Sequence, residues 1–178
     1  MSVAGGTLAA RPGLGAHLMT DLLIRRETPL AVRYQLVINC LEPEPQARFW
    51  AAALGYVPAP APEGFASWDE YLRDLGVPEM YLGKGLDRIS DPQGHGPDIW
   101  FQVVQDRKTI TNRLHLDIHA SGDRSLPFKV RKQRVDAEAL RLAGLGATMV
   151  EASTDDEDGT GPYAVAMRDP EGNEFDIN

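Results

Sequence analysis

Two stretches of the chain alternate between apolar and polar residues. In the first, from Val32 to Cys40, Leu36 and Ile38 fall on one side and Gln35 falls on the other. A period of two is typical of a strand with one buried face. The second stretch, 113–120, alternates in the same way, with an apolar set of Leu114, Leu116, Ile118 and Ala120 and a polar set of His115, Asp117 and His119. The pattern therefore predicts two half-buried strands, each with a polar face.

Helical spacing follows each of these strands. Residues 42–45 end the first strand and open a helix, in which the residues from Gln46 to Leu54 place Phe49, Trp50, Ala53 and Leu54 on one stripe. A longer helix is predicted over Lys129–Ala143, and a short one over Ser67–Leu75, where Ser67 and Glu70 resemble a capping box. The remaining strands are predicted at Tyr56–Val57, Leu86–Ser90, Ile99–Val104, Ala147–Ala152, Tyr163–Arg168 and Asn173–Ile177.

The two halves repeat one another. YQLVINC around Gln35 matches LHLDIHA around His115, 80 residues later, and SDPQG matches RDPEG at a distance of 78 residues. The repeat indicates a duplicated module of strand, helix and three strands. We expect an α+β fold in which two tandem βαβββ modules, about 32–106 and 112–178, form a curved mixed sheet around a central cavity. Their helices cover the apolar face, so the polar face lines the cavity.

Composition narrows the function. A formal charge of −8 argues against nucleic acid and against an anionic membrane surface as partners. The single cysteine, Cys40, excludes an internal disulfide and favours a reducing, cytoplasmic setting. Residues 1–28 are rich in Gly and Ala, which predicts a loose N-terminal extension in which Met19 is an alternative start to Met1. The acidic run at 155–158 is expected to be a solvated loop.

The chain resembles the vicinal oxygen chelate superfamily, and within it the glyoxalase-like proteins. The resemblance is carried by RYQLVINCLEPEPQARFWAAALGY in the first module and by NRLHLDIHA, RVDAEALRLAGLGAT and MRDPEGNEFDIN in the second, and it covers about residues 32–178. It implies a βαβββ module used twice, the plan reached above from the repeat. It also implies a homodimer, because superfamily members commonly pair their modules across a two-fold axis.

The resemblance further implies a metal site. Superfamily enzymes take one ligand from the first and one from the last strand of each module, which points to Gln35, Gln102, His115 and Asp176. Such a set could bind Zn, Ni, Mn or Fe, and the ion would act as a Lewis acid. Metal-using relatives place Glu at the last-strand positions, where this chain has Gln102 and Asp176. Polar cavity walls without a metal are therefore the alternative.

Other polar residues share the expected cavity face. Glu174, Asp117 and His119 are candidate general bases, since proton abstraction needs a titratable group near the reacting carbon. Trp100 and Asn39 are candidate ligand-binding residues. For each of these five, an ordinary hydrogen-bonded or packed position in the wall is the competing interpretation.

Two functions remain open from the sequence. One is a metal-assisted lyase or isomerase that acts on a small oxygenated substrate. The other is a metal-free protein that binds or sequesters a small molecule, as bleomycin-resistance proteins do on this fold. The loops between residues 58 and 97 are expected to select the substrate or ligand.

Overall fold

The computed structural model describes residues 32–153 and 161–178. Residues 34–178 form one compact unit. The predicted N-terminal extension, with Met19, and the acidic run at 155–158 lie outside the described residues. In the part of the chain that is described, no helix has the length and apolar character needed to cross a membrane.

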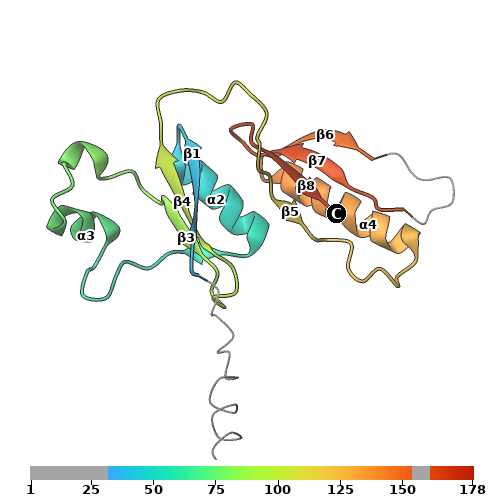
Figure 1. Cartoon of the computed structure of the whole chain (residues 1–178), viewed down its shortest axis with the longest axis horizontal. Coiled ribbons are helices and arrows are strands. Elements are labelled where there is room, and N and C mark those ends of the chain that lie inside the picture. The colour runs from blue at the N-terminus through green and yellow to red at the C-terminus, as the bar shows by residue number, and fades with distance from the viewer. Residues whose placement is uncertain (1–31, 154–160) are drawn as a thin grey trace, which may run out of the picture. The chain divides into compact units, whose positions relative to one another are not determined.

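The first module forms a four-stranded sheet in the order β1-β4-β3-β2, in which β1 runs parallel to β4 (Figure 1). Helix α2 packs against β4, and the short helix α3 lies in the long connection between β2 and β3. The elements are β1 Gln35–Cys40, α2 Pro43–Leu54, β2 Val57–Pro58, α3 Trp68–Asp74, the 3₁₀ turn η1 Glu79–Tyr81, β3 Arg88–Ser90 and β4 Asp98–Val103.

The second module repeats this topology. Its four strands have the order β5-β8-β7-β6, and β5 runs parallel to β8. The elements are β5 Asp117–Ile118, α4 Phe128–Gly144, β6 Thr148–Ala152, β7 Val165–Arg168 and β8 Glu174–Ile177. Adding four to each strand number of the first sheet reproduces the second, which confirms the duplicated βαβββ module and the α+β fold.

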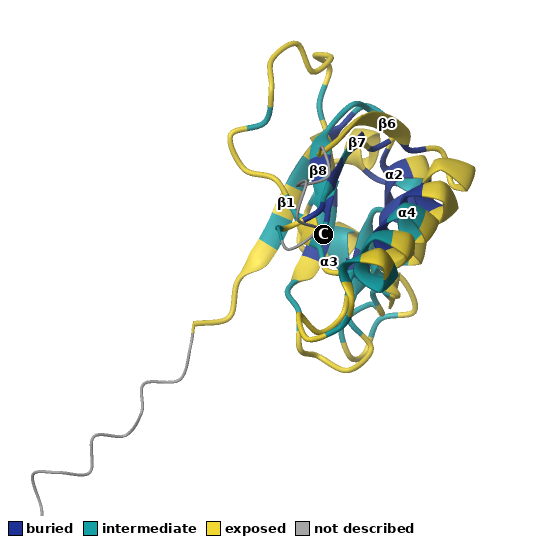
Figure 2. Ribbon diagram, turned by 90° about the vertical axis from the view of Figure 1, so that its right-hand side faces the viewer, coloured by how far each residue is buried: buried dark blue, intermediate teal, exposed yellow. Residues whose placement is uncertain are grey.

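The predicted alternation determines which face of each sheet is buried. Leu36 and Ile38 of β1 are half-buried, whereas Gln35 is exposed. On β8, Phe175 and Ile177 are fully buried, whereas Glu174 and Asp176, on the other face, remain partly exposed. The apolar faces therefore lie under α2 and α4, as Figure 2 shows by the buried residues between the sheets and these helices.

The second alternating stretch was predicted too long. Of residues 113–120, only Asp117 and Ile118 form a strand, and Leu114 is 86% exposed instead of facing the core. The backbone N–H of Asn112 donates to the side chain of Glu174 instead of to a neighbouring strand. The side chain of Glu174 thus holds the backbone at Asn112, and strand pairing with β8 is limited to Asp117 and Ile118.

The first residues of two helices, α2 and α3, follow known preferences for helix N-termini. Helix α2 begins at Pro43, within the segment 42–45 that was predicted to open it, because proline is favoured in the first turn, where its missing N–H costs nothing. The capping box of α3 is confirmed: Ser67 Oγ accepts from Glu70 N at 3.1 Å, and the Glu70 carboxylate accepts from Ala66 N at 2.7 Å.

The two modules share one hydrophobic core. Phe49 and Trp50 of α2 meet Phe175 of β8, with ring centroids 6.1 and 5.2 Å apart. Polar contacts reinforce the junction. The Trp50 indole donates to Asp169 at 3.1 Å, and Arg141 of α4 donates to the last-turn carbonyls of α2 at Ala52 and Ala53. The second module is therefore packed directly on the helix of the first.

Candidate functional site

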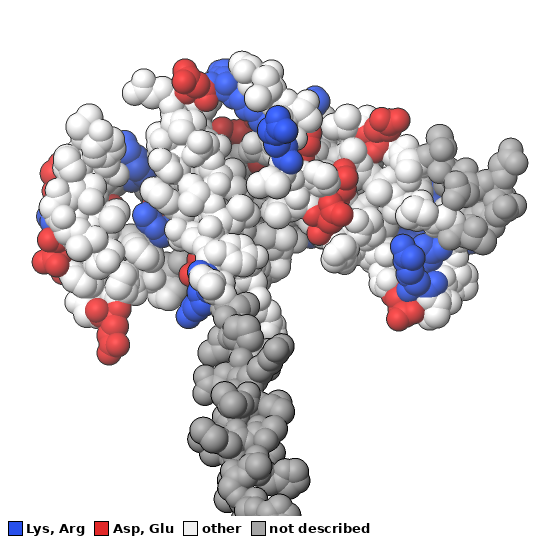
Figure 3. Space-filling view, in the orientation of Figure 1, with Lys and Arg blue, Asp and Glu red and all other residues white. Residues whose placement is uncertain are grey.

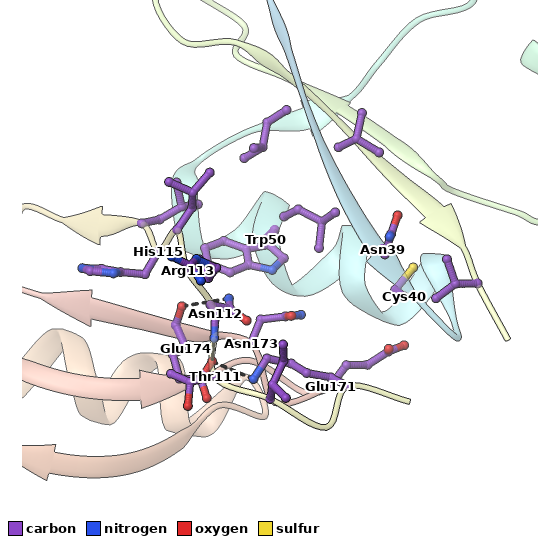
Figure 4. A pocket seen from close by; sticks show the side chains of 18 of the residues that line it. Asn39, Cys40, Trp50, Thr111, Asn112, Arg113, His115, Glu171, Asn173 and Glu174 are labelled. Atoms are coloured by element: carbon purple, nitrogen blue, oxygen red, sulfur yellow. Dashed lines mark hydrogen bonds and ion pairs between the residues drawn. The ribbon is translucent and has the colours of Figure 1, made fainter. Parts of the chain in front are cut away.

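A cavity of about 600 Å³ lies between β1 and the linker, the segment 104–116 that joins the two modules. Apolar residues of β1 and the Trp50 ring form one part of its wall, and polar residues of the linker and of the turn before β8 form another (Figure 4). The polar lining residues include Asn39, Asp106, Lys108, Thr111, Asn112, Arg113, His115, Glu171, Asn173 and Glu174. Figure 3 shows acidic and basic side chains intermingled over the linker rather than a field of one sign.

Three side chains of the second module lie close together, those of His115, Asp117 and Asp176. His115 Nε2 lies 3.3 Å from Asp117 Oδ1 and 3.6 Å from Asp176 Oδ2. One donor atom from each of the three residues lies within 4.8 Å of the other two. His115 also lines the cavity, so the cluster and the cavity share a residue.

The strand register explains why these residues meet. Asp117 of β5 is the direct partner of Asp176 on the parallel strand β8. His115 stands two residues before Asp117, and a spacing of two returns a side chain to the same side of an extended chain. One imidazole and two carboxylates are a donor set that divalent ions such as Mn²⁺, Fe²⁺ or Zn²⁺ accept, and three protein ligands leave positions open for a substrate.

The other two expected metal ligands lie on the first sheet. Gln35 pairs with Asp98, whereas Gln102 pairs with Asn39. Gln35 and Asn39 lie four positions apart, a distance of about 13 Å along the strand, so the structure does not bring the two glutamines together. The register places Trp100, the partner of Val37, where the second module has Asp176. Trp100 lies nine positions after Asp91 of the first DPxG motif, whereas Asp176 lies seven positions after Asp169 of the second, so the repeat alone did not reveal this correspondence.

Asn39 and Trp100 have different surroundings. Asn39 lines the cavity. Trp100 does not; its indole donates to Asp87 at 3.2 Å, and the guanidinium of Arg88 lies 5.2 Å from its ring and 4.4 Å from the ring of Trp68. The connection that carries α3 is anchored on the polar face of β3 and β4 through this stack.

Glu174 holds the linker against β8. Its Oε2 lies 2.7 Å from Lys108 Nζ and accepts from Asn112 N at 3.0 Å, and Arg168 approaches the other oxygen at 3.7 Å. The hydrogen bond from Lys108, followed by that from the Asn112 backbone, lowers the pKa of Glu174 to about 2. A carboxylate with so low a pKa is a weak base at neutral pH, so this geometry favours an anchoring role.

The anchoring role predicts a pH dependence. Because the folded-state pKa of Glu174 lies below its ordinary value of about 4.3, its contribution is present above that value and is lost as pH falls toward about 2. We expect Glu174→Gln to destabilise the protein by about 1 kcal/mol at pH 6, the range for a pair in contact with solvent, and by less as pH falls. Urea unfolding across this range measures the difference, and Glu151→Gln, on the exposed strand β6, is the control. A deficit that does not change with pH would contradict the assignment.

His119 lies outside the cavity, and Cys40 borders the cavity without a reactive thiol. His119 lines a shallow groove against α4, and its Nδ1 lies 2.6 Å from Asn178 Oδ1. Asn178 was not among the expected site residues, although its place two residues after Asp176 was a usable signal. Cys40 is 1% exposed, and burial raises the pKa of its thiol to about 12, so it is an inert core group.

Comparison with known proteins identifies the family to which this chain belongs. The glyoxalase-like domain family matches residues 35–178, and no curated protein matches the chain. A glyoxalase/bleomycin resistance protein/dioxygenase family enzyme from Burkholderia phytofirmans PsJN is similar in structure, with a TM-score of 0.51, 16% identity, and 81% of this chain and 94% of that chain covered. A point mutant of the genomically encoded fosfomycin resistance protein FosX from Listeria monocytogenes, complexed with Mn(II) and 1S,2S-dihydroxypropylphosphonic acid, has a TM-score of 0.50 and 9% identity, with 84% of this chain and 90% of that chain covered. The repeated βαβββ topology and the match over nearly all of the described chain show that the protein belongs to the glyoxalase-like domain family of the vicinal oxygen chelate superfamily.

Proposed function

We propose that this protein is a metal-dependent enzyme, a lyase or isomerase, that binds a small oxygenated substrate in the cavity beside β1. The observation that carries the proposal is the convergence of His115, Asp117 and Asp176 next to that cavity. A divalent ion held there would supply Lewis acidity to a substrate oxygen. That an ion is seen in the Listeria relative adds support, although only the fold is shared at that level of identity.

The chain's own residues have distinct tasks in this proposal. His115, Asp117 and Asp176 would hold the ion, in place of the four-residue set that includes Gln35 and Gln102. Apolar side chains of β1 would bind the carbon skeleton of the substrate and exclude water. Asn39 and Asn112, on facing parts of the wall, offer amide groups that can orient its oxygens (Figure 4).

The test is metal binding by the stripped protein. We expect calorimetric titration with Mn²⁺, Zn²⁺, Ni²⁺ and Fe²⁺ to reveal one site for at least one of these ions. His115→Ala should weaken that binding by at least tenfold, because it removes the only nitrogen donor of the cluster, whereas His95→Ala, in the turn after β3, should leave it unchanged. A wild-type protein that binds none of the four ions would refute the proposal.

Metal-free ligand binding is the second candidate, and the position of Trp50 favours it. Its ring borders the cavity, whose walls include Leu36, Ile38 and Leu116, so an apolar or aromatic ligand would find a suitable surface. Saturable quenching of tryptophan fluorescence in the metal-free protein, without turnover, would support sequestration over catalysis.

We also propose that two copies of the chain form a homodimer and that the protein is cytoplasmic. Strands β1 and β5 lie at the edges of their sheets, and Val37 on β1 is 43% exposed, which supports pairing between two copies. Light scattering on the titrated samples would give the mass in solution. The lone cysteine supports a reducing compartment.

A further inference from the structure

We propose that Asn178 is a positioning residue: its side-chain amide holds Asp117 in the orientation that the His115–Asp117–Asp176 cluster needs, and His119 in turn orients that amide. The inference rests on the proposed metal-dependent function and deepens it. It concerns a residue that contacts neither the cavity nor His115, and that acts only through Asp117.

The backbone of Asn178 is held beside β5. Its N–H donates to Ile118 O at 3.0 Å, and its carbonyl accepts from Ala120 N at 2.6 Å and from Ser121 N at 3.0 Å. These three bonds fix Asn178 against the residues that directly follow Asp117. The side chain therefore starts from a defined place, which a positioning role requires.

The side chain of Asn178 bridges two members of the polar face. Nδ2 donates to Asp117 Oδ2 at 3.1 Å, and Oδ1 lies 2.6 Å from His119 Nδ1. An ionised carboxylate only accepts hydrogen bonds, so the amide nitrogen must be the group that faces Asp117. The amide oxygen then faces His119, and Nδ1 of His119 must carry a hydrogen. Turning the amide over would place its oxygen, an acceptor, against the Asp117 carboxylate, which also only accepts hydrogen bonds. The Asn178 amide therefore has a single favourable orientation.

The consequence is a division of labour between the two oxygens of Asp117. Oδ2 is engaged by Asn178, which leaves Oδ1 toward His115 Nε2 at 3.3 Å. The donor is neutral, so it orients the carboxylate without cancelling the charge that a cation would attract. Among the described residues, no other side chain donates to Asp117 Oδ2. Removing a group that orients a metal-binding carboxylate typically lowers affinity by about 10–100-fold.

The first experiment is calorimetric titration of the full chain with Mn²⁺, Zn²⁺, Ni²⁺ and Fe²⁺ in turn. The wild type and the Asn178 variant are then compared with the ion that the wild type binds most tightly. We expect Asn178→Leu, which keeps the size but removes the amide, to weaken binding by about 10–100-fold. His119→Gln should bind the ion with nearly wild-type affinity, because the glutamine Nε2–H can still donate to the side-chain oxygen of Asn178. His119→Phe should weaken binding, because it has no donor. Thermal unfolding without metal shows whether each variant is folded.

The second experiment does not depend on a metal. Imidazole ¹⁵N NMR at about pH 9, where histidine is neutral, reports which ring nitrogen carries the hydrogen. We expect His119 to be the Nδ1–H tautomer in the metal-free wild type and to lose this bias in Asn178→Leu.

The outcomes separate the two claims. Metal binding that is the same in the wild type and in folded Asn178→Leu overturns the positioning role and leaves the proposed function standing. A wild type that binds no metal overturns both, even where the tautomer is as expected. Weakened binding in Asn178→Leu together with an Nε2–H tautomer in the wild type overturns the part assigned to His119.

Discussion

Trp50→Ala is expected to lower the free energy of unfolding by about 3–5 kcal/mol, the range for truncating a buried tryptophan or phenylalanine. The Trp50 side chain is 2% exposed and packs edge-on against Phe49 and Phe175, with ring centroids 5.3 and 5.2 Å away. Truncation would leave a cavity between the modules and remove the hydrogen bond to Asp169. Urea unfolding measures the loss.

Two variants give this prediction its controls. Trp50→Phe keeps most of the ring volume and loses the indole N–H, so we expect a smaller loss of about 1–2 kcal/mol. Leu140→Ala removes an apolar side chain that is 69% exposed on α4 and should change stability by less than about 1 kcal/mol. A loss below about 1 kcal/mol for Trp50→Ala would show that the modules do not depend on a shared core.

Arg88→Ala is expected to destabilise the protein by on the order of 3 kcal/mol at neutral pH, the lower end of the cost of removing one partner from an ion pair that is largely shielded from solvent. The side chains of Arg88 and Asp87 are 12% and 18% exposed, and Arg88 Nη1 lies 2.8 Å from Asp87 Oδ1. The guanidinium also lies over the rings of Trp68 and Trp100. Its loss would leave Asp87 charged without a cation and would release the connection that carries α3.

The pH dependence identifies the cause of this loss. Burial raises the pKa of Asp87 above its usual value, although Arg88 opposes the shift, so Arg88→Ala should raise that pKa further. A carboxyl group with a raised folded-state pKa destabilises the fold fully above that pKa, and the penalty declines as the pH falls from there to the unfolded-state pKa. The deficit of Arg88→Ala should therefore shrink between neutral pH and about pH 4. The same urea titration of Arg73→Ala, whose partner Glu79 is exposed to solvent, should show little loss of stability at either pH value. A deficit of Arg88→Ala that does not change with pH would contradict the role given to Asp87.

Much of the fold could be predicted because it depends on local patterns. The alternation in β1 and around Phe175 follows from which face must be covered by a helix, and the stripe that includes Trp50 follows from helical spacing. The repeated motifs added that both halves share one plan. The length of β5 could not be predicted in this way, since pairing there depends on where β8 runs and on the side chain of Glu174.

The candidate site was only partly predictable. His115 and Asp176 stood in matched positions of the repeat, and Asp117 was recognised as a polar neighbour. Its place beside them depends on the register of two strands that lie 59 residues apart, as do the bonds that link Asn178 to Asp117 and His119. Register is a property of the paired backbones, so sequence offsets within one hairpin cannot reveal it.

By itself, the sequence determined the duplicated modules, the faces that enter the core and the polar residues available for chemistry, because these follow from periodicities of two and 3.6 residues. The tertiary structure alone decided which of those residues meet. It joined His115 with Asp117 and Asp176, separated Gln35 from Gln102, engaged Trp100 in the stack with Arg88, and fastened Glu174 to the linker. The physical reason is that distance between side chains is set by strand register and by the packing of remote segments, and neither is encoded in local spacing.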